Sequence, residues 1–155
     1  QLGLAHAVLQ AEPHVNGRFV VLNGDNVFQD GIRAAVERAT EPGVDAALLV
    51  EEVTPEAARE TGVVEVDGGR VTSLVVKPDE PPTRLATTGC YVLPEEVFAA
   101  ARLLRLSARG EYELTDAAGV LVRAGATVKA VWDDGERCNV NAPGDIERAA
   151  ELLEE

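Results

Sequence analysis

The chain has 155 residues, of which 46% are hydrophobic, so it is long enough to form one domain with a substantial core. Asp and Glu number 27 against 14 Lys and Arg, giving a formal net charge of −13 at pH 7. This balance argues against nucleic acid or an anionic membrane surface as a partner, and no apolar run in the sequence is long enough to span a bilayer.

The basic residues are almost all arginines, and Lys77 and Lys129 are the only lysines. An acidic, lysine-poor surface is typical of proteins from high-salt cytoplasm, where counter-ions screen the repulsion between like charges. We therefore expect a halophilic protein. The simpler alternative is an acidic protein from a GC-rich genome.

Cysteine and methionine usage indicate where the chain comes from. Cys90 and Cys138 form no Cys-x-x-Cys pair, so we expect reduced thiols in or near the core, a cytoplasmic location and no zinc site. The sequence contains no methionine, and structured-looking sequence follows Gln1 at once. We therefore expect the chain to be the later part of a longer protein.

The first third of the sequence alternates between helical and extended patterns. Apolar residues at helical spacing predict a helix over residues 3–11. Residues 19–22 have the length and β-branched content of a buried strand, and a second such run covers residues 45–51. Between them, Asp30 is a plausible N-cap for a helix over residues 31–40. This order predicts parallel strands joined by a helical crossover.

The rest of the sequence predicts further strands and three more helices. Residues 61–66 and 70–76 flank a glycine-rich turn and predict a β-hairpin. Strands are expected over residues 85–93, 127–132 and 137–140, with a turn at 133–135. Helices are expected after Pro94, after residues 109–116 and over residues 143–153, the last with Ile146, Ala149, Ala150 and Leu153 on its apolar side. Because no segment has the length of a linker, we expect one α/β domain over residues 1–155.

The stretch over residues 18–26 places polar side chains directly after the first predicted strand. An open α/β sheet binds ligands beyond the carboxyl ends of its strands. Gly24 would let a ligand approach the backbone, and Asp25 supplies a hard oxygen for a divalent cation. The simpler interpretation is an ordinary polar turn, since Gly, Asp and Asn are common turn residues.

Other polar residues also fall at strand ends, and in an α/β sheet they can converge on one crevice. Asp25 and Asn139 could hold Mg²⁺ through oxygen, because this ion needs few protein ligands beside phosphate. Lys77 would suit an anionic or hydroxyl-rich ligand. Taken singly, Lys77 is equally well a solvated lysine and Asn139 a turn amide. The full set is Asp25, Asn26, Gly62, Lys77, Thr87, Thr88, Gly89, Asn139 and Asn141.

Seven short stretches occur in an order and at spacings that resemble one family, the sugar-1-phosphate nucleotidyltransferases. This family includes the glucose-1-phosphate thymidylyl- and uridylyltransferases. The stretches are LGLAHA (residues 2–7), LNGDN (22–26), GVVE (62–65), VVKP (75–78), TGCY (88–91), RGEYELTD (109–116) and NVNAP (139–143). RGEYELTD is the most specific of them.

The resemblance implies a fold, a reaction and a set of site residues. The fold would be a Rossmann-like mixed sheet flanked by helices, as in nucleotide-diphospho-sugar transferases. The reaction would transfer a nucleotidyl group from dTTP or UTP to a sugar 1-phosphate and release pyrophosphate, with Mg²⁺ as cofactor. The implied catalytic residues are Asp25 and Lys77, and the implied metal ligands are Asp25 and Asn139. The implied substrate-binding residues are Gly3, Asn26, Gly62, Lys77, Thr87 and Gly89.

The sequence departs from the family pattern in three places. Val76 stands where a glutamate often precedes the Lys-Pro pair, so a sugar contact is lost or supplied elsewhere. Asn139 stands where the hexose-1-phosphate enzymes usually have aspartate. The family's N-terminal strand and Gly-rich triphosphate loop have no counterpart in this chain. We therefore expect an N-terminally truncated chain that is inactive alone, with an exposed sheet edge that favours pairing with a second copy.

Two alternatives to this function stay open. The first is a non-catalytic binding or assembly module derived from the same fold, which Val76 and the lack of the triphosphate loop favour. The second is a transferase that acts on amino-sugar phosphates, which Asn139 allows because such relatives use asparagine at this position.

Overall fold

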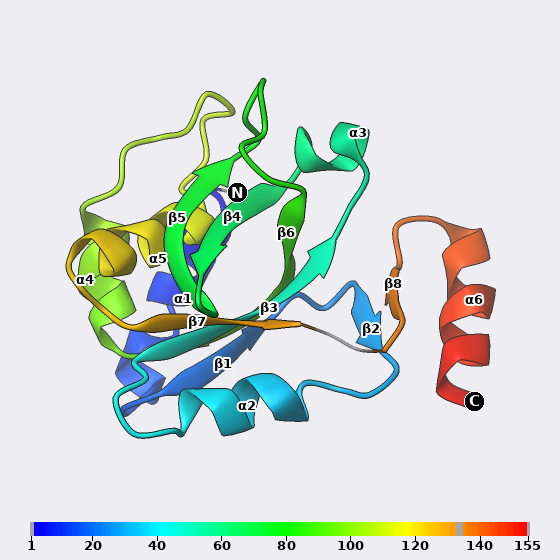
Figure 1. Cartoon of the computed structure of the whole chain (residues 1–155), viewed down its shortest axis with the longest axis horizontal. Helices are drawn as coiled ribbons and strands as arrows, with labels where there is room; N and C mark the ends of the chain where they lie inside the picture. The colour runs from blue at the N-terminus through cyan, green and yellow to red at the C-terminus, as the bar shows by residue number, and fades with distance from the viewer. Residues whose placement is uncertain (1, 133–134, 155) are drawn as a thin grey trace.

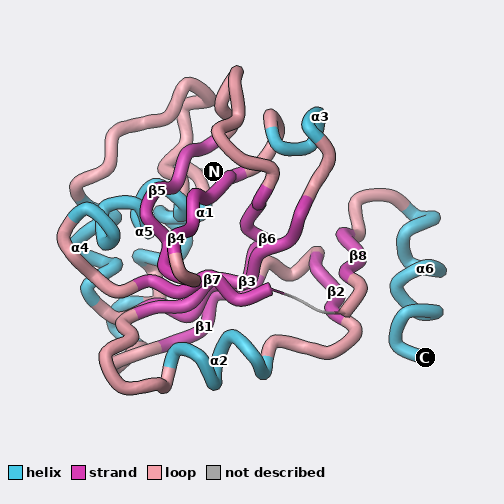
Figure 2. The backbone as a smooth tube through the Cα atoms, viewed as in Figure 1, coloured by secondary structure: helices cyan, strands magenta, loops and turns pink. Residues whose placement is uncertain are grey.

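The computed structural model describes residues 2–132 and 135–154, so the turn expected at residues 133–135 lies mostly outside the described residues. Most of the expected strands and helices are confirmed, while β2 and α3 have no counterpart in the sequence predictions. The elements, which Figures 1 and 2 show, run in the order α1 (Leu4–Leu9), η1 (Glu12–His14), β1 (Phe19–Leu22), β2 (Asn26–Phe28), α2 (Arg33–Ala39), β3 (Ala46–Glu52), α3 (Pro55–Ala58), β4 (Gly62–Asp67), β5 (Arg70–Val76), β6 (Leu85–Leu93), α4 (Glu96–Arg102), α5 (Leu114–Arg123), β7 (Val128–Trp132), β8 (Arg137–Asn139) and α6 (Pro143–Glu154).

The main sheet contains strands in the order β1-β6-β3-β7-β5-β4. Among these described strands, β3 and β7 are the one parallel pair, and the other pairings are antiparallel. The sheet also closes on itself, because β4 pairs with β6 at Val63 and Ala86 (Figure 1). The expected mixed α/β fold is therefore confirmed. The sheet, however, is a small closed barrel of β6, β3, β7, β5 and β4 rather than an open Rossmann-like sheet.

Strands β1 and β3 run in the same direction and are joined through α2, as expected, but they are not neighbours, because β6 lies between them and runs antiparallel to both, so the expected parallel sheet is a mixed one. Strand β6 is 9 residues long and buried along nearly its whole length, so it needs a neighbour on each side. Strand β1 is consequently an edge strand within the described part of the chain. Its Val20 and Leu22 side chains are 39% and 45% exposed, so the expectation of a fully buried strand is also wrong.

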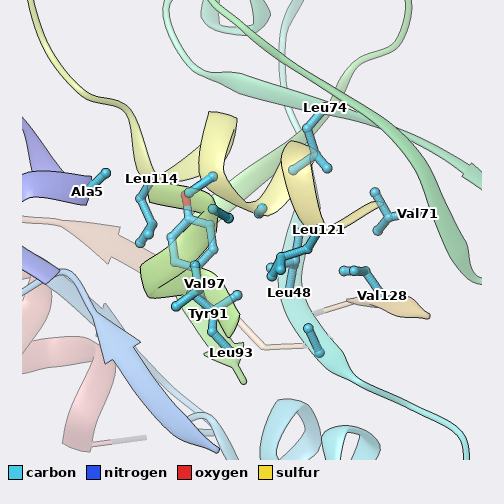
Figure 3. Close-up of a cluster of buried hydrophobic side chains, with 14 of the residues drawn as sticks. Ala5, Leu48, Val71, Leu74, Tyr91, Leu93, Val97, Leu114, Leu121 and Val128 are labelled. Atoms are coloured by element: carbon cyan, nitrogen blue, oxygen red, sulfur yellow. The ribbon is translucent and has the colours of Figure 1, made fainter. Parts of the chain in front are cut away.

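Strand β3 contributes to hydrophobic clusters on both faces of the sheet, because successive residues of a strand point to opposite faces. Leu48 belongs to the larger cluster, formed with α1, α4 and α5, and Figure 3 shows it among Tyr91, Leu121 and Val128. Leu49 belongs to the second cluster, with Ala35 and Ala39 of α2. The continuous apolar run in the sequence therefore reflects burial on two sides.

Helix α2 begins at Arg33. The expectation that Asp30 is its N-cap is wrong. The residue at the cap position is Ile32, whose side chain makes no capping hydrogen bond. Gly31 has a φ of +69°, and this left-handed residue turns the backbone between Asp30 and the helix. The Asp30 carboxylate lies instead beside Gly135, where a Cβ atom would be 2.7 Å from its Oδ2.

Helix α6 packs on the small sheet of β2 and β8, apart from the main sheet (Figure 1). Ala149 and Leu152 are its buried residues, whereas Ile146 and Leu153 are 61% and 65% exposed. Of the four residues predicted to lie on the apolar side of this helix, only Ala149 is buried. A two-stranded sheet is narrow and covers a single stripe of the helix, which explains the difference.

Both cysteines are buried, as expected, and they are not joined to each other by a disulfide bond. Cys90 lies in the cluster beneath α2, and Cys138 belongs to β8 and packs against α6. Within residues 2–132 and 135–154, no helix has the length and apolar character needed to cross a membrane.

Candidate functional site

A cavity of about 260 Å³ collects nearly all the predicted site residues. Its walls come from the turn after β1, from β4 and β6, from the end of β5, from the start of α5 and from β8. The predicted residues that line it are Asp25, Asn26, Gly62, Lys77, Thr87, Thr88, Gly89 and Asn139. A larger hollow of about 570 Å³ beside Arg18, Asp45 and Pro94 contains none of the predicted residues.

The turn after β1 is held in place by backbone hydrogen bonds from both sheets. The Asn23 N–H donates to the Gly89 carbonyl oxygen at 2.9 Å, and the Val140 N–H donates to the Asp25 carbonyl oxygen at 2.7 Å. In the ladder of β2 and β8, Asn26 lies directly opposite Asn139. Asp25 and Asn139, distant in sequence, are thus neighbours at the same wall of the cavity.

This arrangement fits a hard divalent cation. A carboxylate and an amide oxygen are suitable ligands for Mg²⁺, which keeps several waters or phosphate oxygens in its shell. Asp25 has no ion-pair partner in the described part of the chain, and its Oδ1 accepts a hydrogen bond of 2.7 Å from Asn26 Nδ2. No cluster of three or more His, Cys, Asp or Glu side chains suited to a metal occurs among the described residues. Any cation here therefore needs ligands from a bound substrate or water.

Lys77 has an unusual backbone conformation. Its φ is +43°, and it is the one described residue other than glycine with a positive φ. Such a conformation costs a non-glycine residue of order 1–3 kcal/mol and is often found at functional sites. The Lys77 N–H donates to the Thr61 carbonyl oxygen at 2.8 Å, and Nζ lies 3.4 Å from Glu60 Oε2. The strained residue thus presents an ammonium group at the cavity wall.

Gly62 and Gly89 are explained by close packing around the cavity. A Cβ atom at Gly89, whose φ is +84°, would lie 2.6 Å from Asn23 Nδ2. A Cβ atom at Gly62 would lie 2.9 Å from the Oγ1 atom of Thr115. The structure therefore accounts for both glycines through side chains that line the cavity, while their contact with substrate stays a prediction.

Gly3 lies outside this cavity, as does Asn141. Gly3 borders a neighbouring hollow of about 570 Å³ that shares Asn23, Asp25 and Arg109 with the cavity. Its φ is +95°, and a Cβ atom there would lie 2.6 Å from the Tyr112 carbonyl oxygen. The close approach of two backbones thus requires glycine at this position, and its role toward a nucleotide stays a prediction.

Three hydroxyl groups form a short chain at the cavity wall. Tyr91 Oη donates to Thr87 Oγ1 at 3.2 Å and lies 3.2 Å from Thr115 Oγ1. Burial raises the pKa of Tyr91, although hydrogen bonds with Thr115 and Thr87 act in the opposite direction. The phenol therefore stays neutral at physiological pH, and its one O–H holds the Thr87 hydroxyl in place at the cavity wall.

Four charged residues at the cavity were not among the predicted site residues: Glu60, Arg109, Glu113 and Arg137. Arg109 Nη1 lies 3.8 Å from Glu111 Oε2 and 3.9 Å from Glu113 Oε1. All three residues belong to the RGEYELTD stretch, so that motif was the sequence signal that could have identified Arg109. Arg137 had no local signal, because its partner Glu51 is 86 residues away in the sequence. Arg109 joins Lys77 as a second cation for an anionic ligand, whereas Arg137 is already paired with Glu51.

The family model described as "Nucleotidyl transferase" matches residues 1–141. The chain is 41% identical to the UTP–glucose-1-phosphate uridylyltransferase AglF of Haloferax volcanii, covering 100% of this chain and 64% of that protein. It is 38% identical to the low-salt glycan biosynthesis nucleotidyltransferase Agl11 of the same organism, covering 98% of this chain and 43% of that protein. The chain thus spans less than two thirds of each of these relatives.

Solved structures give the same picture. A UTP-bound UGPase from Acinetobacter baumannii superposes with a TM-score of 0.81 at 27% identity, covering 99% of this chain and 56% of that one. A UDP-glucose pyrophosphorylase in complex with UDP-glucose superposes with a TM-score of 0.82 at 22% identity, covering 99% of this chain and 63% of that one, which shows a shared fold.

Proposed function

This chain belongs to the nucleotidyl transferase family, and from that premise we propose that it forms the sugar-phosphate and cation-binding part of a glucose-1-phosphate uridylyltransferase. The observation that carries the proposal is the cavity in which Asp25, Lys77 and Asn139 meet. UTP is preferred over dTTP because AglF is a uridylyltransferase and the Acinetobacter structure contains UTP. The buried thiols and acidic composition support a cytoplasmic reaction.

The reaction is an in-line displacement at the α-phosphorus of the nucleotide. An oxygen of the sugar 1-phosphate forms a new bond to that phosphorus, the bond to the bridging oxygen breaks, and pyrophosphate leaves. Lys77 and Arg109 neutralise the phosphate of the sugar as it approaches. The Thr87 hydroxyl, which Tyr91 holds in place, offers a hydrogen bond to the sugar ring.

Asp25 and Asn139 are the residues that would hold Mg²⁺, which neutralises developing negative charge when bound. Their placement on two adjacent backbone segments keeps the two oxygen ligands together. The Val76 side chain at the end of β5 cannot accept a hydrogen bond from a sugar hydroxyl, whereas the carboxylates of Glu60 and Glu113 line the same cavity and can. We assign the sugar-hydroxyl contact to these two carboxylates.

The experiment is pyrophosphate release by the protein expressed from the complete reading frame, with Mg²⁺, UTP or dTTP, and a panel of sugar 1-phosphates. The expected result is fastest release with UTP and glucose 1-phosphate, and loss of release in Asp25→Ala. Preference for an N-acetylamino sugar phosphate would favour the alternative that Asn139 suggests. No release with any pair would favour the non-catalytic module.

A further inference from the structure

We propose that Glu51 and Arg137 are positioning residues that orient the Asp25 carboxylate through the side chain of Asn26. The inference rests on the proposed function only in taking Asp25 as the cation ligand. Neither Glu51 nor Arg137 belongs to the motifs that suggested the site. The connection runs from Glu51 in β3 through Arg137 in β8 to Asn26 in β2, and Arg137 and Asn26 line the cavity.

The Arg137 guanidinium uses all three of its nitrogen atoms within this connection. Nε donates to Glu51 Oε2 at 3.2 Å, and Nη2 donates to Glu51 Oε1, which makes a bidentate pair. Nη1 donates to Asn26 Oδ1. Because each of its three nitrogens already donates to Glu51 or Asn26, the orientation of Arg137 is fixed, and it is suited to holding a neighbour in place rather than to capturing a ligand.

The contact with Arg137 fixes which way the Asn26 amide faces. An arginine can only donate hydrogen bonds, so the amide oxygen of Asn26 must face Arg137 and the amide nitrogen must face away. That nitrogen donates to Asp25 Oδ1 at 2.7 Å. One carboxylate oxygen of Asp25 is thereby held, and Oδ2 is left for a cation.

Burial makes this pair different from the other ion pairs in the described part of the chain. The Arg137 and Glu51 side chains are 18% and 27% exposed. One residue further along β3, Glu52 pairs with Arg84, but these side chains are 67% and 58% exposed. A pair shielded from water holds its geometry better than an exposed one, and the Glu52–Arg84 pair provides a matched control.

Positioning and simple electrostatics predict opposite effects for Arg137→Met. Removing a positive charge and leaving Glu51 unpaired makes the cavity more negative, so charge alone would tighten the binding of a cation. If Arg137 acts by orienting Asn26 and Asp25, its loss weakens cation binding despite the more negative cavity. The sign of the change therefore separates the two explanations.

The test is Mn²⁺ binding to this chain, followed by electron paramagnetic resonance, with Mn²⁺ in place of Mg²⁺. We expect Arg137→Met and Glu51→Gln to raise the dissociation constant about 10-fold or more, the usual size of effects from partners of metal ligands. Arg137→Lys keeps the positive charge but loses the bidentate contact with Glu51, so we expect it to bind Mn²⁺ more weakly than the wild type and more tightly than Arg137→Met. Arg84→Met should bind Mn²⁺ like the wild type.

A second readout needs no metal. In ¹H–¹⁵N spectra, the Asn26 side-chain amide should exchange slowly with solvent in the wild type and in Arg84→Met, and quickly in Arg137→Met. Backbone resonances that remain dispersed in Arg137→Met establish that the variant is folded. Unchanged Asn26 exchange in a folded Arg137→Met would overturn the inference.

The outcomes also separate this inference from the proposed function. If Asp25→Ala loses Mn²⁺ binding while Arg137→Met binds Mn²⁺ as tightly as the wild type or more tightly, the positioning role is wrong and the cation site stands. If the wild type binds Mn²⁺ no better than Asp25→Ala, the cation site itself is wrong, and the inference is overturned with it.

Discussion

Asn26 and Asn139 face each other across the two-stranded ladder of β2 and β8, although they lie near opposite ends of the chain. This register brings the Asp25 carboxylate and the Asn139 amide to the same wall of the cavity. The pairing of two short strands thus assembles the proposed cation site, and it also connects this site to Arg137 at the far end of β8.

The amide at position 139 should make the proposed cation site weak. Asn139→Asp adds a charged oxygen ligand beside Asp25, so we expect Mg²⁺ to bind about 10-fold more tightly, as measured by isothermal titration calorimetry. Asn16→Asp makes the same substitution in an exposed loop and should leave the affinity unchanged. Equal affinities for wild type and Asn139→Asp would show that position 139 does not touch the cation.

Lys77 should contribute to binding at the expense of stability. Asn tolerates a left-handed backbone better than Lys, so Lys77→Asn should leave the free energy of unfolding unchanged or raise it by up to about 1 kcal/mol. The same change should weaken glucose 1-phosphate binding about 10-fold or more, because a charged hydrogen bond is lost. Lys129→Asn, at the other lysine, should bind the sugar phosphate normally. Urea unfolding and calorimetry measure the two effects, and normal binding by Lys77→Asn would contradict the assignment.

Gly89 should be intolerant of any side chain. Gly89→Ala places a methyl group against Asn23 in a backbone conformation that alanine disfavours, so we expect a loss of about 1–3 kcal/mol in the free energy of unfolding. Gly24→Ala, in the turn after β1 that also contains Asn23, has open space around it and should cost less than about 1 kcal/mol. Similar urea midpoints for the two variants would mean that the close approach of Asn23 and Gly89 does not matter.

Asp116, in the first turn of α5, should destabilise the protein at neutral pH. Burial, followed by the nearby Glu113 carboxylate, raises the pKa of Asp116 above its usual range, and Arg123 opposes the shift. The folded state then holds the proton more tightly, so stability falls as pH rises through the raised pKa. Asp116→Asn should be more stable than wild type at pH 7, by less than about 1 kcal/mol because the site is partly solvated. The difference should vanish near pH 3, and a difference that grows toward acid pH would contradict this.

High salt should stabilise the fold. With a net charge of −13, like charges repel one another in the compact state, and added ions screen that repulsion. We expect the midpoint of urea unfolding to rise between low and molar KCl. Equal midpoints would remove the case for salt adaptation.

Local patterns predicted local structure well. The expected strand over residues 85–93 has the same bounds as β6, and the hairpin of β4 and β5 is where its glycine-rich turn placed it. Such features depend on neighbouring residues, which the sequence displays directly.

Long-range contacts could not be predicted in the same way. The barrel closes through the pairing of Val63 with Ala86, and no pattern at either residue indicates the other. The Arg137–Glu51 pair was missed for the same reason, since a single Arg in a polar stretch looks like any surface residue. The predicted apolar face of α6 was wrong at Ile146, which is hydrophobic but 61% exposed.

The central claim is that a sugar 1-phosphate binds in the cavity lined by Asp25, Lys77 and Asn139, and chemical-shift mapping of this chain with glucose 1-phosphate tests it most directly. We predict Mg²⁺-dependent shifts of the backbone amides of Gly62, Lys77, Gly89 and Asn139, and their loss in Asp25→Ala. Shifts confined to the hollow beside Arg18 and Asp45, or no shifts at saturating ligand, would contradict it.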